Sequence, residues 1–310
     1  MTLIILNKSP VVNFFSKELY KIFLRKIIGK NRGPNGVTES TIRGLEELNY
    51  EYKLNPNTKE INSEDVIWVN ESIDTLRWAI NFKKETQKLV AGPNLVIFPT
   101  DENEVLCGKN IDIILQPSAW TKDLMSSIKP ELEKKIKIWP AGVFVPNKTN
   151  IIKDINVLIY TKNNSKKELL EKIKNKLKED NKKVETIDYG TFKQKEYFDL
   201  LERSEMMIYI ANSESQGLAL QEAWARNIPT LVFDKEKFEH NGKTFKYEKI
   251  SAPYLNEESG MFFKENDFIE KYNEFISKIN SFKAKEYVIN NLSDKVCAQK
   301  FLEIINDFKL

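Results

Sequence analysis

The sequence has few of the residues that build metal sites and disulfide frameworks. Its 310 residues include one histidine, His240, and two cysteines, Cys107 and Cys297, which lie far apart in the chain. A zinc site needs three or four ligands such as these, and a disulfide-stabilised fold needs several cysteines. The composition therefore argues against a bound metal, against an oxidising compartment, and against histidine-based catalysis anywhere except at His240.

Long apolar runs are also absent. No stretch approaches the roughly 18 uncharged apolar residues of a membrane-spanning helix, and the chain has no signal-peptide cleavage pattern. The hydrophobic content of 41% and the charged content of 30% are typical of a soluble globular protein. A chain of this length accommodates two domains of about 100–200 residues each. We therefore expect a cytoplasmic protein with two domains.

The chain has only a small excess of positive charge, and this excess is concentrated in its first 32 residues. The formal net charge of +3 gives no reason to expect a nucleic-acid partner. The first 32 residues hold seven basic side chains (Lys8, Lys17, Lys21, Arg25, Lys26, Lys30 and Arg32) and one acidic side chain, Glu18. Residues 11–28 fit an amphipathic helix. Its apolar face either packs on the sheet of the first domain or lies on an anionic membrane surface.

Short apolar runs alternate with helical patterns along the whole chain. The runs that we interpret as strands are residues 2–6, 66–69, 95–98, 111–115, 136–139, 155–160, 184–187, 207–210 and 230–233. This alternation predicts an α/β fold with two doubly wound, Rossmann-like domains. A polar stretch with a proline, residues 145–150, is the expected joint. The first domain is then 1–148 and the second 151–292, and the helical spacing of apolar residues in 293–310 predicts a closing helix.

Residues 212–229 carry most of the functional information. An apolar strand precedes the polar turn 212–217, and a helical pattern follows the turn up to Pro229. A glycine-containing turn that opens a helix after a strand presents backbone N–H groups to an anion. Glu214 and Glu222 lie a little over two helical turns apart, so we expect both side chains on the ligand side.

This stretch resembles the Glu-x7-Glu signature of retaining GT-B glycosyltransferases, especially glycosyltransferase family 4. The matching residues are Glu214, Gly217, Leu218, Glu222, Ala223 and Pro229. The resemblance implies that Glu214 contacts the hydroxyls of a donor sugar and that Glu222 holds the ribose of the nucleotide. It assigns the diphosphate to the backbone amides of Ser215, Gln216, Gly217 and Leu218. Two glutamates at this spacing would also suit the acidic first turn of an ordinary helix.

Weaker similarities extend over most of the chain. Residues 33–37 resemble the family's first glycine-rich loop, in which Gly36 would approach the donor phosphates. We expect a helix after this loop with Thr38 as its N-cap; the same residues also make an ordinary turn. Residues 117–122, 138–143 and 259–263 resemble later segments of the family. In GT-B proteins the two domains face a cleft and the last helix often crosses back onto the first domain. The resemblance therefore implies a cleft here and a first domain that includes the helix in 293–310.

One feature of the family is replaced. Its members usually carry Gly-Arg after the first strand of the second domain and a lysine some residues later. Here Lys162 stands near the position of the arginine, with Lys166 or Lys167 as the second cation. The same lysines would also suit the solvated start of the next helix. Lysine lacks the bidentate fork of arginine, so looser phosphate binding is expected.

The resemblance implies a retaining, metal-independent glycosyltransferase of polysaccharide biosynthesis. It would move a sugar from a nucleotide sugar to a glycan, a lipid-linked molecule or another hydroxyl acceptor, without a cofactor. Asp101 and Glu102, after the expected strand 95–98, and Glu71 are candidates for a catalytic base. The alternative is that each is an ordinary carboxylate of a surface loop. The alternatives are a sugar-nucleotide- or glycan-binding protein without turnover and a nucleotide-sugar epimerase, although an epimerase needs more histidines and acids around the sugar.

Overall fold

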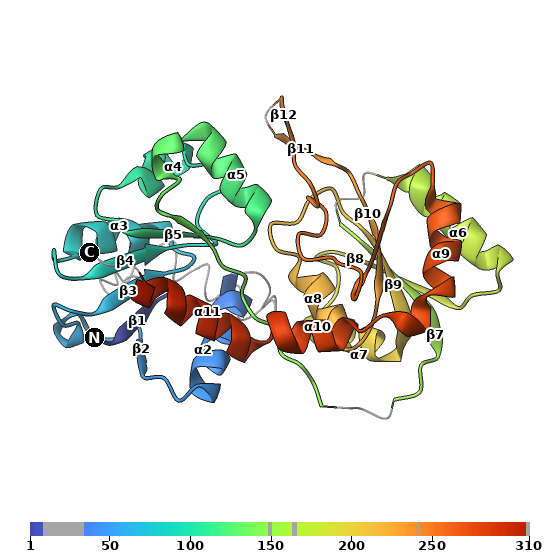
Figure 1. Cartoon of the computed structure of the whole chain (residues 1–310), viewed down its shortest axis with the longest axis horizontal. Helices are drawn as coiled ribbons and strands as arrows, with labels where there is room; N and C mark the ends of the chain where they lie inside the picture. The colour runs from blue at the N-terminus through green and yellow to red at the C-terminus, as the bar shows by residue number, and fades with distance from the viewer. Residues whose placement is uncertain (9–33, 148–150, 163–165, 241, 308–310) are drawn as a thin grey trace. The chain divides into compact units, whose positions relative to one another are not determined.

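The computed structural model describes residues 1–8, 34–147, 151–162, 166–240 and 242–307. Contacts divide the chain into two compact units (Figure 1). Unit 1 consists of Met1–Gly142 with Asp294–Leu310, and unit 2 is Val143–Ser293. The predicted boundaries near 148/151 and 292/293 stay predictions. The predicted amphipathic helix 11–28, with its membrane contact, lies outside the described residues.

A six-stranded sheet lies at the centre of unit 1, in the order β2-β1-β3-β4-β5-β6, and all its pairs are parallel. The strands are β1 (Leu3–Leu6), β2 (Tyr52–Leu54), β3 (Val66–Val69), β4 (Lys88–Ala91), β5 (Ile113–Gln116) and β6 (Ile136–Ile138). The helices are α2 (Pro34–Glu47), α3 (Ile73–Phe82), α4 (Asp101–Glu104), α5 (Ala119–Ile128) and α11 (Asp294–Asp307), with single 3₁₀ turns at Thr58–Glu60, Val105–Cys107 and Pro130–Leu132. Every residue of β1, β3 and β5 is buried, because a parallel sheet is covered on both faces.

Helices cover both faces of this sheet. One hydrophobic cluster joins the strands to α3 and α5 and includes Ile4, Ile67, Leu76, Leu89, Ile114 and Met125. On the opposite face the ring of Trp68 in β3 lies 5.0 Å from Phe301 of α11, and Trp139 lies 5.2 Å from the same phenylalanine. The last helix is therefore part of the core of unit 1, which confirms its predicted return to the first domain.

Helices α2 and α11 pack closely at a glycine. A Cβ atom on Gly44 of α2 would lie 2.2 Å from the carbonyl oxygen of Asp294, the first residue of α11. The buried carboxylate of Asp294 forms an ion pair with Arg43 at 2.6 Å. Burial raises the pKa of Asp294, and the neighbouring Arg43 guanidinium opposes this shift. The absence of a side chain at Gly44 and this charge pair together fix where the two helices cross.

One strand of unit 1 was predicted in the wrong place. Residues 95–98 are irregular, and the strand in this part of the chain is β4, which the sequence did not predict. Strand β4 ends before Gly92, whose φ of 94° is incompatible with an extended strand, and before Pro93, which has no N–H to donate to a ladder. The apolar run 95–98 follows this break and so does not continue the sheet.

The start of α2 also differs from the prediction. Residues 34–36 were expected in a loop, but they form the first turn of α2. Pro34 is the first residue of this helix, where the backbone N–H has no partner within the helix, so proline, which lacks an N–H, is well tolerated. Thr38 therefore lies inside the helix, and the prediction that it is the N-cap was wrong. Its hydroxyl oxygen accepts a hydrogen bond of 3.1 Å from the side-chain amide of Asn70.

Unit 2 contains a five-stranded sheet in the order β13-β10-β9-β7-β8, again with parallel pairs. The strands are β7 (Ile155–Thr161), β8 (Val184–Asp188), β9 (Ser204–Ile210), β10 (Thr230–Phe233) and β13 (Gly260–Phe263). The helices are α6 (Lys167–Glu179), α7 (Gln194–Arg203), α8 (Leu218–Trp224), α9 (Phe268–Ser277) and α10 (Ala284–Asn291), with a 3₁₀ turn at Ile279–Ser281. Between β10 and β13 an antiparallel hairpin, β11 (Lys237–His240) and β12 (Lys243–Lys246), was not predicted.

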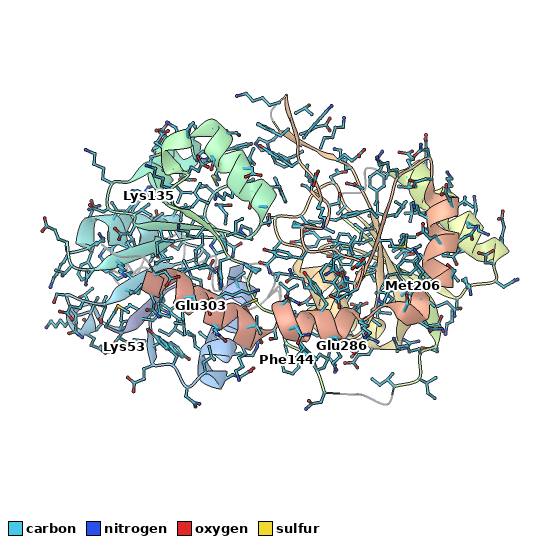
Figure 2. The ribbon with its side chains drawn as sticks, in the orientation of Figure 1. Lys53, Lys135, Phe144, Met206, Glu286 and Glu303 are labelled. Carbon is cyan, nitrogen blue, oxygen red and sulfur yellow. The ribbon has the colours of Figure 1, made fainter. Side chains whose placement is uncertain are left out.

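Helices cover both faces of this second sheet as well. Helices α6 and α9 lie next to each other on one face (Figure 1), and Leu169, Ile173 and Leu177 form the apolar stripe of α6. Met206 of β9, labelled in Figure 2, is buried beneath them. On the other face Tyr197 of α7 donates a hydrogen bond of 2.6 Å to the carbonyl oxygen of Ala219 in α8. The prediction of two Rossmann-like α/β domains is therefore confirmed. In the part of the chain that the structure describes, no helix is both long enough and apolar enough to cross a membrane.

Candidate functional site

The strand order of unit 2 defines one point at which a ligand site is expected. Strand β7 leads through α6 to β8 on one side, whereas β9, its neighbour on the other side, leads through α8 to β10. The two connections leave on opposite faces of the sheet, so their loops diverge at the carboxyl ends of β7 and β9. Open α/β sheets bind ligands in the crevice formed at such a switch point. The residues after β7 and β9 are therefore the first place to look for function.

Glu214 and Lys162 meet at this switch point. Lys162 follows β7 directly, and its backbone N–H donates to the carbonyl oxygen of Ile210, the last residue of β9 (2.8 Å). The side-chain ammonium of Lys162 lies 2.8 Å from Oε1 of Glu214, four residues after β9. The Glu214 side chain is 9% exposed and that of Lys162 is 24% exposed. Two of the predicted site residues thus form a partly buried ion pair at the edge where a ligand is expected.

Aromatic side chains surround this pair. The phenol of Tyr209 donates a hydrogen bond of 2.6 Å to the same Oε1 atom of Glu214. Complete burial raises the pKa of Tyr209 well above its usual value, and the charge of Glu214 raises it further, so the phenol keeps its proton and remains a donor. The ring of Tyr209 stacks on Tyr160 of β7 at 4.8 Å. On the exposed side, the Lys162 ammonium lies 4.9 Å from the centre of the Tyr189 ring.

The turn between β9 and α8 has a conformation that requires glycine. Gly217 precedes α8 with φ 86° and ψ 49°, a left-handed conformation that glycine adopts at little cost. A Cβ atom there would lie 3.2 Å from Leu220. The backbone N–H of Glu214 donates to the carbonyl oxygen of Ile250 (2.8 Å), and Gln216 donates to Gln221 (2.9 Å). The turn 214–217 is therefore held in place at both ends, and Ser215 within it is exposed.

Glu222 lies on α8, apart from these contacts. The side-chain amide of Gln194, the first residue of α7, donates to its Oε1 at 3.3 Å. Its backbone carbonyl oxygen accepts a hydrogen bond from Arg226 at 3.1 Å. The side chain is half-buried. The Gln194 contact with the Glu222 side chain therefore comes from α7, whereas the Lys162 and Tyr209 contacts with the Glu214 side chain come from the carboxyl ends of β7 and β9.

Lys166 lies close to the switch point but has other partners. Its ammonium lies 2.9 Å from Glu265 and 5.2 Å from the centre of the Phe233 ring, while Lys167 next to it is exposed. A small hollow of about 10 Å³ lies between the two loops and includes Lys162, Lys166 and Asn212 in its lining. A larger, open hollow of about 530 Å³ shares Lys166 and Asn212 and extends to the carboxyl end of β10. A volume of this size is within the range of small-molecule sites.

Two predicted site residues of unit 1, Asp101 and Glu102, have partners within that unit. Asp101 accepts a hydrogen bond of 2.8 Å from the backbone N–H of Phe98, and Glu102 is exposed and pairs with Arg77 at 3.0 Å. Gly36 lies in the first turn of α2, where a Cβ atom would have no neighbour within 4 Å among the residues that the structure describes. Asp101 and Glu102 therefore have local structural roles in unit 1, and their assignment to catalysis stays a prediction, as does that of Glu71.

The sequence did not identify Tyr209 and Tyr189 as members of the site. Tyr209 lies in the apolar run of β9, where a tyrosine is readily interpreted as part of the hydrophobic core. Tyr189 directly follows β8. A signal was available in both cases, since each tyrosine lies at the carboxyl end of a predicted parallel strand. Among the described residues no group of three or more histidine, cysteine, aspartate or glutamate side chains is arranged to hold a metal ion.

No protein-family model matches the sequence, and no curated protein matches it. Solved structures do resemble it. The GtfA/B complex has 11% identity over 80% of this chain with a TM-score of 0.54, and TarM has 14% identity over 87% with a TM-score of 0.52. This chain covers 58% of each of those two. The lipopolysaccharide outer core galactosyltransferase WaaB, in its apo form, has 11% identity and a TM-score of 0.52, with 99% of each chain covered. The fold is of the GT-B class.

Proposed function

We propose that this protein is a retaining glycosyltransferase that moves a sugar from a nucleotide sugar to a hydroxyl group of a glycan or lipid-linked acceptor. The observation that supports the proposal most is the pairing of Lys162 with Glu214 at the switch point of unit 2. A sugar diphosphate requires a cation for its phosphates and a hydrogen-bonding side chain for its hydroxyls. This pair offers both within 3 Å of each other.

The proposed reaction needs little covalent chemistry from the protein. The bond between the anomeric carbon and the diphosphate oxygen breaks, and a bond from the acceptor oxygen forms on the same face of the sugar. The proton of the acceptor hydroxyl passes to the departing phosphate, so neither a metal nor a protein base is required. The protein accelerates the step by positioning the two substrates and by stabilising the charge that develops on the diphosphate.

The residues have distinct roles in this proposal. Lys162, with the amides of the turn 215–218, stabilises the leaving diphosphate. Glu214 accepts hydrogen bonds from the hydroxyls of the sugar, and Glu222 binds the ribose diol. The likeness to WaaB in fold, over the full length of both chains, agrees with sugar transfer.

Incubation with UDP-, GDP-, TDP- and ADP-sugars tests the proposal directly. A glycosyltransferase without its acceptor is expected to release nucleoside diphosphate slowly from one of these donors, with the freed sugar initially in the anomeric configuration of the donor. Isomerisation of the sugar would identify an epimerase instead. Binding of a donor without any turnover would identify a sugar-nucleotide-binding protein, and either result would reject the proposal.

Replacement of Glu222 by alanine is expected to weaken nucleotide binding. A hydrogen bond to a charged group contributes about 1.5–3 kcal/mol, so the dissociation constant should rise roughly 10- to 150-fold. Isothermal titration of the nucleoside diphosphate of the preferred donor measures the change. Glu179→Ala, which removes an exposed carboxylate at the end of α6, is the matched control and should leave affinity unchanged. Equal affinity of Glu222→Ala and the parent would exclude the ribose role.

A further inference from the structure

One oxygen atom of Glu214 receives two donors of different character. Oε1 lies 2.8 Å from the ammonium of Lys162 and 2.6 Å from the phenol of Tyr209. Tyr209 is 1% exposed and is fixed by its strand and by its stacking on Tyr160. The Lys162 side chain is 24% exposed, and its ammonium ends a flexible four-carbon chain. The phenol is therefore a fixed partner of Glu214, whereas the ammonium can move.

The ion pair neutralises the cation that a diphosphate would need. With Lys162 bound to Glu214, the two side chains together present no net charge at the carboxyl ends of β7 and β9. A phosphate group that approaches this edge meets a carboxylate as well as an ammonium, and like charges repel strongly where water is partly excluded. The second cation nearby, Lys166, is itself paired with Glu265 at 2.9 Å.

We propose that Lys162 changes partner when a nucleotide sugar binds: its ammonium leaves Glu214 and contacts the diphosphate, while Tyr209 holds Glu214 in position for the sugar hydroxyls. This inference rests on the proposed function, because it assigns a diphosphate to the switch point of unit 2. No covalent bond changes in the exchange. One hydrogen-bonded ion pair is replaced by another, and the carboxylate receives hydroxyl donors in place of the ammonium.

The exchange links recognition of the two halves of the donor. Oε1 of Glu214 gains room for a sugar hydroxyl when a diphosphate has drawn Lys162 away, whereas a free sugar meets an oxygen that already accepts from Lys162 and Tyr209. Conversely, a diphosphate without a sugar would draw Lys162 away from Glu214 but would bring no sugar hydroxyls to replace the ammonium as donors to this carboxylate. The pair therefore favours the complete nucleotide sugar over either of its parts. Specificity arises here from the cost of leaving a partly buried charge without a partner.

Isothermal titration with UDP, GDP, TDP and ADP tests the exchange on the full chain. Glu214→Gln is expected to bind the preferred nucleoside diphosphate roughly three- to tenfold more tightly than the parent, because Lys162 no longer has a competing carboxylate. Lys162→Met should bind it roughly five- to thirtyfold more weakly, and adding Glu214→Gln to this variant should bring no gain. Tyr209→Phe should also weaken binding of the nucleoside diphosphate. Without the phenol donor, Glu214 depends more on Lys162, so the ammonium is harder to draw away.

A control and a second measurement separate this exchange from a change in folding. Asp154→Asn removes a carboxylate that pairs with Lys183 and Arg203 before β7, at the opposite edge of the sheet, and should leave the affinity unchanged. The gain in Glu214→Gln should shrink as salt rises, because added ions screen the released ammonium. Unchanged or weaker binding by Glu214→Gln, with a parent that binds, overturns the exchange alone. Absence of binding by every variant overturns both the exchange and the proposed function.

Discussion

Replacement of Lys162 by methionine is expected to slow the release of nucleoside diphosphate from the preferred sugar nucleotide by on the order of 10²–10³-fold. Methionine keeps the length of the side chain and removes its charge. Loss of one preorganised group that stabilises developing negative charge raises a barrier by about 3–4 kcal/mol. The change should fall mainly on kcat, because the departing phosphate carries more negative charge in the transition state than in the bound donor. Steady-state rates across a range of donor concentrations measure it.

Two controls accompany the Lys162 experiment. Lys178→Met removes an exposed lysine near the carboxyl end of α6, at the opposite edge of the same sheet, and is expected to keep the parental rate. Lys162→Met leaves Glu214 buried without its cationic partner, so its thermal midpoint is measured beside its activity. The double variant Lys162→Met/Glu214→Gln restores charge balance and should remain slow. A folded Lys162→Met protein that turns over donor at the parental rate would remove Lys162 from the site.

Gly44→Ala is expected to destabilise unit 1 by about 1–3 kcal/mol, the usual cost of adding atoms to a well-packed contact. The new Cβ atom would lie 2.2 Å from the carbonyl oxygen of Asp294 and 2.6 Å from Cβ of Ala298, so α2 and α11 must separate. Because the obstacle is backbone, no change of side-chain conformation relieves it. The midpoint of chemical unfolding, followed by circular dichroism, measures the loss.

The matched control is on the same helix. At Gly36 a Cβ atom would meet no atom of the described part of the chain within 4 Å, so Gly36→Ala should gain the intrinsic helix preference of alanine, about 0.5–1 kcal/mol. The two substitutions are chemically identical and are expected to have opposite signs. If both stabilised the protein by similar amounts, the close crossing of α2 and α11 would be wrong.

Most strands were predictable because parallel strands are buried on both faces and read as apolar runs. Residues 66–69 and 155–160 have this character and form β3 and β7. The failure at β4 has a physical cause. Its sequence, Lys-Leu-Val-Ala, is less apolar than residues 95–98, and only its pairing with β3 and β5 decides that it is the strand. The hydrophobicity of a short segment does not predict which distant strands it will pair with.

The candidate site was predictable in part. The spacing of Glu214, Gly217 and Glu222 in the sequence led to the turn after β9, and Gly217 has the left-handed conformation that such a turn needs. The contact between Lys162 and Glu214 joins residues 52 positions apart, so it exists only through the pairing of β7 with β9. Tyr209 was not identified because its role depends on which face of the sheet its side chain occupies.

The return of α11 to unit 1 has a consequence for biosynthesis. Phe301, which packs on Trp68 and Trp139, leaves the ribosome only after all of Val143–Ser293 has been made. Unit 2 is continuous in sequence and has every strand it needs by then. During translation, residues 1–142 of unit 1 therefore exist without α11 while unit 2 is synthesised and can fold. Until α11 has been made, Trp68 and Trp139 lack the contact with Phe301. An apolar surface left open during translation is where aggregation and chaperone binding begin.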